Sequence, residues 1–308
     1  MLLPPPIKHP VTVHGEDGNW VFAVNSWRTD LFGWNTEFSN FVGSRQLIYS
    51  SGHVSSIASL AVSEDASLVA GGSLDGTVRV WRRDSDKAFR LIFSQKAHAK
   101  TVWTLRFAPD KSMLASGSED GTVRIWPVRS LLGTVKSEML SPKGRSLGRL
   151  VISPGGRRLA VEASRIEAPG AETLAETLLW RIVGGKPIGE PILLKGFCAA
   201  FSGDERLLAS VDGSVIYVWA LGRTVPTRPK VSLRGHTGDI NAIDLSRDGR
   251  WLVSAGDDGS ARLWDLNAPS GAESAVILRG HEGSVFGAVF SKDSKWVVTG
   301  GEDRTARI

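Results

Sequence analysis

Histidine, aspartate and tryptophan recur together along this chain at a fixed spacing. In three sets an aspartate follows the histidine after 22 residues, and a tryptophan follows six residues later: His53, Asp75 and Trp81; His98, Asp120 and Trp126; His236, Asp258 and Trp264. His281 and Asp303 repeat the first spacing. A hydroxyl residue stands four positions before three of the aspartates, at Ser116, Ser254 and Thr299. Because Ser, His and Asp can together activate a nucleophile, hydrolysis is the first chemistry to consider.

The number of copies argues against catalysis by these residues. An active site needs one such constellation at a cleft, whereas this sequence repeats it three or four times at the same spacing. The sequence also contains no Gly-x-Ser-x-Gly elbow, no phosphate-binding loop ending in Gly-Lys-Ser/Thr and no His-Glu-x-x-His motif. We therefore expect no catalytic residues and a structural role for the repeated ones.

Metal, cofactor and disulfide chemistry have little support in the sequence. His9 and His14, five residues apart, could share a metal, but no cysteine and no second histidine pair joins them. The single cysteine, Cys198, cannot form an internal disulfide, and we expect it to pack within a strand. We expect neither a metal nor a cofactor.

The composition is that of an ordinary globular protein, with 308 residues of which 42% are hydrophobic and 22% are charged. A net charge of +5 over this length produces only a weak field. No apolar run approaches the roughly 18 residues of a membrane span. Prolines at 4–6 interrupt the N-terminal apolar stretch too early for a signal peptide. We expect a soluble, cytoplasmic protein that does not bind membranes.

A polar turn followed by a short apolar run recurs through the whole chain, for example at 107–117 and 245–255. The turns centre on Asp17, Asp65, Asp110, Gly155, Asp204, Asp248 and Asp293. The gaps between them are 48, 45, 45, 49, 44 and 45 residues. The chain therefore contains seven units of about 46 residues, a period typical of propellers and solenoids.

Each unit contains several short β-like runs, such as 114–116 and 122–125, separated by Gly, Asp and Ser. Asp-Gly pairs favour tight turns, because both residues tolerate positive φ. Only residues 171–179 suggest a helical apolar period. Four short antiparallel strands repeated seven times predict an all-β fold, a seven-bladed β-propeller with four-stranded blades. We expect it to form a single domain over residues 1–308.

These motifs resemble the WD40 repeat family, and the resemblance covers nearly the whole chain. Its marks include Gly52-His53, Gly235-His236, Gly280-His281 and Trp264-Asp265. The resemblance implies that His, Asp, Ser or Thr, and Trp form a hydrogen-bonded tetrad inside each blade, which satisfies its buried polar groups. Four arginines share one repeated slot, two positions before a closing tryptophan or its expected place, and are expected to be structural; these are Arg79, Arg124, Arg262 and Arg307.

Some units depart from the pattern. The fourth, about residues 143–185, lacks the His and Asp and carries extra residues, Arg165 to Glu176, which we expect to form a protruding loop. The first keeps only its turn and Trp34. The chain ends at Ile308, within the expected third strand of the last blade. We expect either an incomplete last blade or one closed by the N-terminal segment, as WD40 propellers commonly are.

The resemblance also implies where a partner binds. In WD40 propellers the usual contact face carries the turns after the histidines. There, the residue after the first buried aliphatic of the inner strand tends to point outward. Those residues here are Ala58, Trp103, Asn241 and Phe286, and the polar neighbours are Lys100, Asp239 and Ser284. Val102 and Leu105 can both face the core only if a bulge between them frees Trp103. The alternative is that the Trp103 and Phe286 rings fold back onto neighbouring blades.

The pattern favours a non-catalytic scaffold or adaptor: a monomeric propeller that binds a protein or peptide, as a module of a larger signalling or regulatory protein. Exposed Trp and Phe would anchor the partner. Two alternatives stay open, a propeller enzyme with its site at the central channel and nucleic-acid binding that weakens steeply with salt. The basic residues available for the latter are Arg145, Arg149, Arg157, Arg158, Arg223, Arg228 and Lys230. Because acidic residues are interspersed, we do not expect a nucleic-acid partner.

Overall fold

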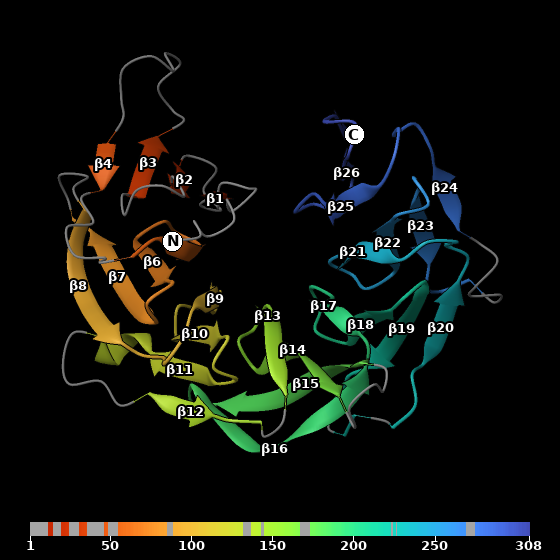
Figure 1. Cartoon of the computed structure of the whole chain (residues 1–308). Coiled ribbons are helices and arrows are strands. Elements are labelled where there is room, and N and C mark those ends of the chain that lie inside the picture. The colour runs from red at the N-terminus through yellow and green to blue at the C-terminus, as the bar shows by residue number, and fades with distance from the viewer. Residues whose placement is uncertain are drawn as a thin grey trace. The chain divides into compact units, whose positions relative to one another are not determined.

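The computed structural model describes four strands near the N-terminus by their backbone alone, at 12–14, 20–24, 31–35 and 46–48. It further describes residues 55–84, 89–131, 137–142, 145–166, 173–222, 224–225, 227–268 and 275–308. Apart from one short 3-10 helix, η1 (Val128–Ser130), the regular elements of these residues are strands. The strands form seven sheets, each built from strands that follow one another in the chain (Figure 1).

The first three sheets have four strands each, in sequence order. The first contains β1 (Thr12–His14), β2 (Trp20–Val24), β3 (Leu31–Asn35) and β4 (Gln46–Ile48). The second contains β5 (Ile57–Val62), β6 (Leu68–Ser73), β7 (Thr77–Arg83) and β8 (Phe89–Lys96). The third contains β9 (Val102–Phe107), β10 (Met113–Ser118), β11 (Val123–Pro127) and β12 (Glu138–Leu140).

The remaining sheets repeat this order, and the last of them has three strands. The fourth contains β13 (Ser146–Ile152), β14 (Arg158–Ile166), β15 (Thr173–Val183) and β16 (Lys186–Lys195). The fifth contains β17 (Phe197–Phe201), β18 (Leu207–Asp212), β19 (Val215–Ala220) and β20 (Val231–Arg234). The sixth contains β21 (Ile240–Leu245), β22 (Trp251–Gly256), β23 (Ala261–Asp265) and β24 (Val276–Leu278). The seventh contains β25 (Val285–Phe290), β26 (Val297–Gly301) and β27 (Ala306–Arg307).

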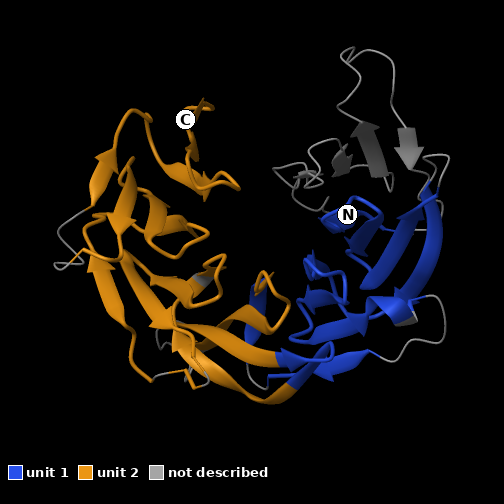
Figure 2. Ribbon diagram, turned by 180° about the vertical axis from the view of Figure 1, so that it is seen from behind, with its two compact units in different colours: residues 1–150, 182–187 blue, residues 151–181, 188–308 orange. Residues whose placement is uncertain are grey.

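The chain divides into two compact units (Figure 2). Unit 1 comprises residues 1–150 and 182–187, and unit 2 comprises residues 151–181 and 188–308. Within unit 1, one apolar core joins the second and third sheets through Val80, Val102, Leu105, Leu114 and Trp126. Burial of each such side chain contributes roughly 1.5–3 kcal/mol.

In unit 2, successive side chains of one strand pack into two different apolar cores. Leu252 of β22 packs with Ile243 and Trp264 in a core shared with the fifth sheet. Its neighbour Val253 packs with Val285 in a second core shared with the seventh sheet. Successive side chains of a strand point to opposite faces, so a sheet between two others must be apolar on both.

A serine–aspartate turn connects the first and second strands in four of the described sheets. The serine hydroxyl donates to the aspartate Oδ1 over 2.6 to 2.8 Å, in the pairs Ser63–Asp65, Ser202–Asp204, Ser246–Asp248 and Ser291–Asp293. The residue after each aspartate has a positive φ. The first of the seven turn centres, Asp17, lies outside the described residues.

The loop expected from Arg165 to Glu176 is wrong at both of its ends. Arg165 belongs to β14 and Glu176 to β15, which are paired strands, and residues 173–179 are strand and not helix. Val161 and Ala163 are buried and alternate with half-buried Glu162, which is the period of a strand. The extra residues therefore lengthen a β-hairpin, and the ladder runs on to the pair Ile166 and Thr173.

The last sheet has three strands among the described residues, as one of the two alternatives expected. The N-terminal strand β1 pairs with β2 in the first sheet. Trp34, expected to close the first unit, lies in β3. The described part of the chain contains no helix with the length and apolar character needed to cross a membrane.

Candidate partner-binding surface

His236, Ser254, Asp258 and Trp264 form one hydrogen-bonded chain in the sixth sheet. The Trp264 indole Nε1 donates to Ser254 Oγ at 2.9 Å, and the same oxygen lies 2.8 Å from His236 Nε2. His236 Nδ1 lies 2.9 Å from Asp258 Oδ2. Because the carboxylate can only accept, the Nδ1 of a neutral His236 carries the proton and donates it to Asp258, and Nε2 accepts from the Ser254 hydroxyl. A neutral histidine satisfies every member of this chain.

Thr122 enters the corresponding network of the third sheet. The Trp126 indole donates to Ser116 Oγ at 3.2 Å, and Ser116 Oγ lies 2.8 Å from His98 Nε2. His98 Nδ1 lies 2.8 Å from Thr122 Oγ1 but 3.5 Å from Asp120 Oδ2. Thr122 Oγ1 donates to Asp120 Oδ1 at 2.6 Å. The histidine therefore reaches the aspartate through the Thr122 hydroxyl. The resemblance had implied a direct hydrogen bond between histidine and aspartate.

The seventh sheet contains a network without a tryptophan among its described residues. His281 Nδ1 lies 3.0 Å from Asp303 Oδ1, and its Nε2 lies 2.9 Å from Thr299 Oγ1. An arginine of the repeated slot reaches the aspartate in two sheets, since Arg307 lies 3.9 Å from Asp303 and Arg262 lies 3.8 Å from its own aspartate. These arginines act within the sheets.

The second sheet is described only in part. Trp81 is buried, and Asp75 accepts a hydrogen bond from the Thr77 backbone N–H at 2.8 Å. His53 lies outside the described residues. The arrangement around this aspartate matches that of Asp258, which accepts from the backbone N–H of Ser260 at 3.1 Å.

The environment of these networks suits support and not reaction. Burial lowers the pKa of His236 against the raising effect of Asp258, and burial likewise lowers the pKa of His98. Ser116 and Ser254 are completely buried. A nucleophile must touch its substrate, so these hydroxyls cannot act as one. Among the described residues, no group of three or more His, Cys, Asp or Glu side chains is placed to hold a metal ion.

A β-bulge interrupts the first strand of four sheets at one repeated position. The ladder skips Ala58 in β5, Trp103 in β9, Asn241 in β21 and Phe286 in β25. A bulge lets two residues oppose one and re-aims a side chain. Val102 and Leu105 are therefore both buried, while the side chain of Trp103 is 49% exposed and that of Phe286 is 57% exposed. Both rings are thus about half exposed to solvent.

The other two bulge residues differ from the aromatic ones. The Asn241 side-chain amide donates to Asp257 Oδ1 at 2.7 Å and to the Val285 carbonyl at 3.2 Å, so it ties two sheets of unit 2 together. Ala58 is half-buried. Asn241 therefore contributes to sheet packing more than to a free surface.

The polar residues expected at the contact face, Lys100, Ser284 and Asp239, make contacts within their own units. In unit 1, exposed Lys100 lies 3.4 Å from Glu119. In unit 2, the Ser284 backbone N–H donates to Glu302 Oε2 at 3.1 Å, and exposed Asp239 accepts through its carbonyl from the Asp257 N–H at 2.9 Å. Each unit thus has a bulged, exposed aromatic residue whose strand begins next to charged residues of both signs.

A cavity of about 400 Å³ lies beside Trp103 in unit 1. Its walls come from β5, β9 and β13, and they include Ala58, Trp103, Arg106, Leu147 and Arg149. Arg106 is not part of the repeated motifs. When the repeats are aligned by their turns it differs from its counterpart in the sixth unit, which is an aspartate.

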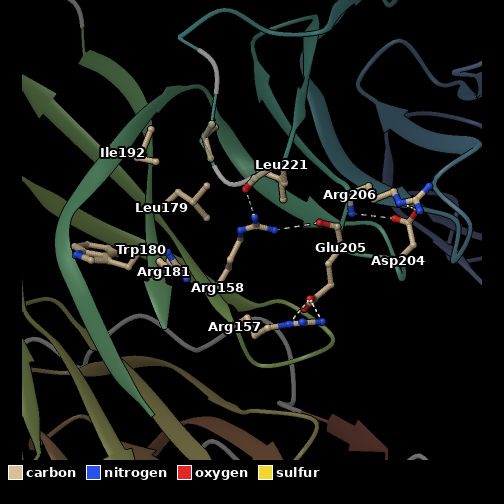
Figure 3. A pocket seen from close by; sticks show the side chains of 12 residues that line it. Arg157, Arg158, Leu179, Trp180, Arg181, Ile192, Asp204, Glu205, Arg206 and Leu221 are labelled. Carbon is tan, nitrogen blue, oxygen red and sulfur yellow. Dashed lines mark hydrogen bonds and ion pairs between the residues drawn. The ribbon is translucent and has the colours of Figure 1, made fainter. Parts of the chain in front are cut away.

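A second cavity, of about 420 Å³, lies in unit 2 beside the turn at 155 (Figure 3). Arg157 lies 2.9 Å from Glu205, and Arg158 donates to the carbonyls of Glu205 at 3.1 Å and Gly222 at 2.9 Å. Leu179, Ile192 and Leu221 form apolar wall. Two arginines considered for nucleic-acid binding are therefore engaged within the protein, and Arg223 lies outside the described residues.

The successive sheets and their repeated networks are those of a β-propeller protein. A chain of the crystal structure of the mitotic checkpoint complex has this fold with a TM-score of 0.70, at 17% identity, over 99% of the present chain and 89% of that chain. The WD domain, G-beta repeat model matches residues 44–82, 89–127, 227–265 and 272–308, together half of the chain. The chain belongs to the WD40 repeat family.

Curated relatives match shorter segments. The target of rapamycin complex subunit LST8 of Saccharomyces cerevisiae is 29% identical over 21% of this chain and 21% of its own length. The small ribosomal subunit protein RACK1 of Caenorhabditis elegans is 41% identical over 21% of this chain and 19% of its own length. The Notchless protein homolog of Arabidopsis thaliana is 38% identical over 20% of this chain and 12% of its own length. The matches thus span about a fifth or less of these relatives.

Proposed function

We propose that this protein is a non-catalytic scaffold that binds a protein partner through its bulged residues, on one surface in each unit. Trp103 and Phe286 are the anchors. The observation that carries the proposal is that a bulge exposes each ring beside a buried aliphatic residue, at the same position of two repeats. Exposed aromatic side chains on a rigid support are the residues that dominate binding energy at protein interfaces.

The relatives support the same class of function. One is named as a subunit of the target of rapamycin complex, and another as a protein of the small ribosomal subunit. By analogy we place the present chain in a multi-protein assembly, as a monomeric cytoplasmic propeller formed by residues 1–308 within a larger signalling or regulatory system. Its partner is a peptide segment or a domain.

The charges around the anchors favour a protein partner over nucleic acid. Glu119 and Glu302 stand near the two aromatic residues, and each interacts with a neighbour on the same surface. A phosphate backbone needs several cations that it can neutralise in a row. A mixed-sign rim around an apolar anchor is the usual anatomy of a protein interface.

The experiment compares capture by three purified forms of the protein from an extract of the producing cell. The double variant Trp103→Ala/Phe286→Ala should lose partners that the wild type retains. The matched control is Trp296→Ala, which removes an aromatic side chain that is 60% exposed. Trp296 directly precedes β26 and so lies at the opposite end of the seventh sheet from Phe286, as the pairing of Phe290 with Val297 shows. Equal capture by the double variant and the wild type would refute the proposed surface.

A further inference from the structure

The cavity beside Trp103 carries positive charge without an acidic wall. Arg106 and Arg149 line it, and none of its other lining residues is acidic. The remainder of the wall is apolar or small, with Leu60, Leu105 and Leu147 among its residues. At about 400 Å³ its volume is within the range of pockets that receive a small ligand or one side chain.

Arg106 has donors to spare. It is half-buried, and its one hydrogen bond within the described residues runs from Nη1 to the Leu105 carbonyl at 2.9 Å. A guanidinium carries five N–H donors, so most of them are available to a ligand. Burial, and then the nearby charge of Arg149, lower the pKa of Arg106. An anion in the cavity would relieve both effects.

The fold does not require an arginine at this position. Arg106 pairs with Ala115 in the third sheet, in the register at which Asp244 pairs with Val253 in the sixth. In the seventh sheet the same place is held by Val289. An aspartate and a valine therefore serve the same strand position. Because the strand accepts such different side chains there, sheet formation does not explain why this position is an arginine.

We propose that this cavity receives the carboxylate of an Asp or Glu side chain from an extended segment of the protein partner, with an adjoining apolar residue on Trp103. The inference rests on the proposed function and names the chemistry of its partner. A carboxylate matches the planar fork of a guanidinium and forms paired, charge-assisted hydrogen bonds with it. The free donors of Arg106 suit one such group, whereas a nucleic-acid strand would require a longer track of cations.

The test uses peptide pools of defined composition on immobilised protein. Each pool contains 12-residue peptides with a fixed central Leu-Glu, Leu-Gln or Leu-phosphoserine pair and uncharged residues at all other positions. The wild type should enrich the Glu pool over the Gln pool by about ten-fold or more. Arg106→Gln should abolish this preference, and Arg106→Lys should retain part of it.

The controls distinguish loss of the Arg106 site from a general loss of positive charge and from unfolding. Arg228→Gln removes an exposed arginine of unit 2 and should leave the preference unchanged. Melting temperatures establish that each variant is folded, and the Glu-to-Gln ratio of the wild type is decisive even if Arg106→Gln does not fold. Equal enrichment of the Glu and Gln pools, no capture of either, or a preference for phosphoserine over Glu would overturn the inference.

The outcomes also distinguish this inference from the proposed function. If Trp103→Ala abolishes capture while Arg106→Gln leaves the Glu-to-Gln ratio unchanged, the surface is correct and the carboxylate site is wrong. If neither variant alters peptide capture, the peptides bind elsewhere, and both the carboxylate site and the proposed surface of unit 1 are wrong.

Discussion

The carboxylate of Glu205 accepts a hydrogen bond from the backbone N–H of Gly155 at 2.6 Å. Glu205 stands in the turn of the next sheet, fifty positions further along the chain. The other six turns have an aspartate at this place in the sequence, whereas the turn at 155 has a glycine. Glu205 therefore supplies from outside the anion that this turn lacks, and Arg157 neutralises it at 2.9 Å (Figure 3).

Removal of the Glu205 carboxylate should loosen this turn. Burial alone would raise the pKa of Glu205, but hydrogen bonds from Ser153 and Gly155 and the charge of Arg157 lower it overall. Glu205→Ala should lower the free energy of unfolding by about 1–3 kcal/mol, because the part-buried hydrogen bond from Gly155 and the ion pair with Arg157 are both lost. Urea denaturation measures the change.

A second substitution makes this prediction specific. Gly155 does not have a positive φ, so an aspartate can adopt its backbone conformation. A Cβ there would lie 3.0 Å from the Glu205 carboxylate oxygens, so Gly155→Asp alone should destabilise the protein. In the Glu205→Ala background the same substitution should restore part of the lost stability. Additive losses in the double variant would contradict the account.

The tetrad aspartate of the sixth sheet should make the free energy of unfolding depend on pH in the acid range. Burial would raise the pKa of Asp258, but hydrogen bonds from Ser260 and Thr237 and the charge of His236 bring it to about 2. The folded pKa lies below the unfolded value of about 3.9, so the contribution is complete above that pH and disappears toward pH 2. Asp258→Asn should flatten the fall in unfolding free energy between pH 4 and 2. An unchanged slope would show that the carboxylate is not held this way.

The tetrad histidines should act in a higher pH window. Burial lowers the pKa of His98 and of His236, so the unfolded chain takes up protons first as the pH falls. Their contribution is complete above about pH 6.5 and decreases below it. The denaturation midpoint should therefore fall between pH 7 and 5, and His236→Gln should reduce that slope. A steeper slope in the variant would mean that the histidine is charged in the folded protein.

The sequence was sufficient for the repeat pattern and for the bulge at Trp103, because both follow from spacing along the chain. It could not show that Thr122 stands between His98 and its aspartate, because that depends on side-chain geometry. Nor could it show that Glu205 completes a turn fifty residues away. The long hairpin of the fourth sheet was expected to be a loop, because the length of the unit shows that residues are added but not that they pair as strands.

Truncation to alanine should cost little stability at the exposed Trp103 and much at the buried Trp126. Trp103→Ala should change the free energy of unfolding by less than about 0.5 kcal/mol, because Trp103 is about half exposed and is in none of the described buried cores. Trp126 is completely buried and meets the Phe93 ring edge-on at 5.2 Å. Trp126→Ala should lower stability by about 3–5 kcal/mol. A large loss for Trp103→Ala would mean that its ring packs in the core.

Site-specific photo-crosslinking tests the central claim most directly. A photoreactive phenylalanine analogue is placed at position 103, 286 or 296 of the full chain, and the protein is irradiated in the producing cell. The account predicts a discrete protein adduct from positions 103 and 286 and none from position 296, which lies at the other end of the seventh sheet from 286. Adducts from position 296 alone, or equal adducts from all three positions, would contradict it.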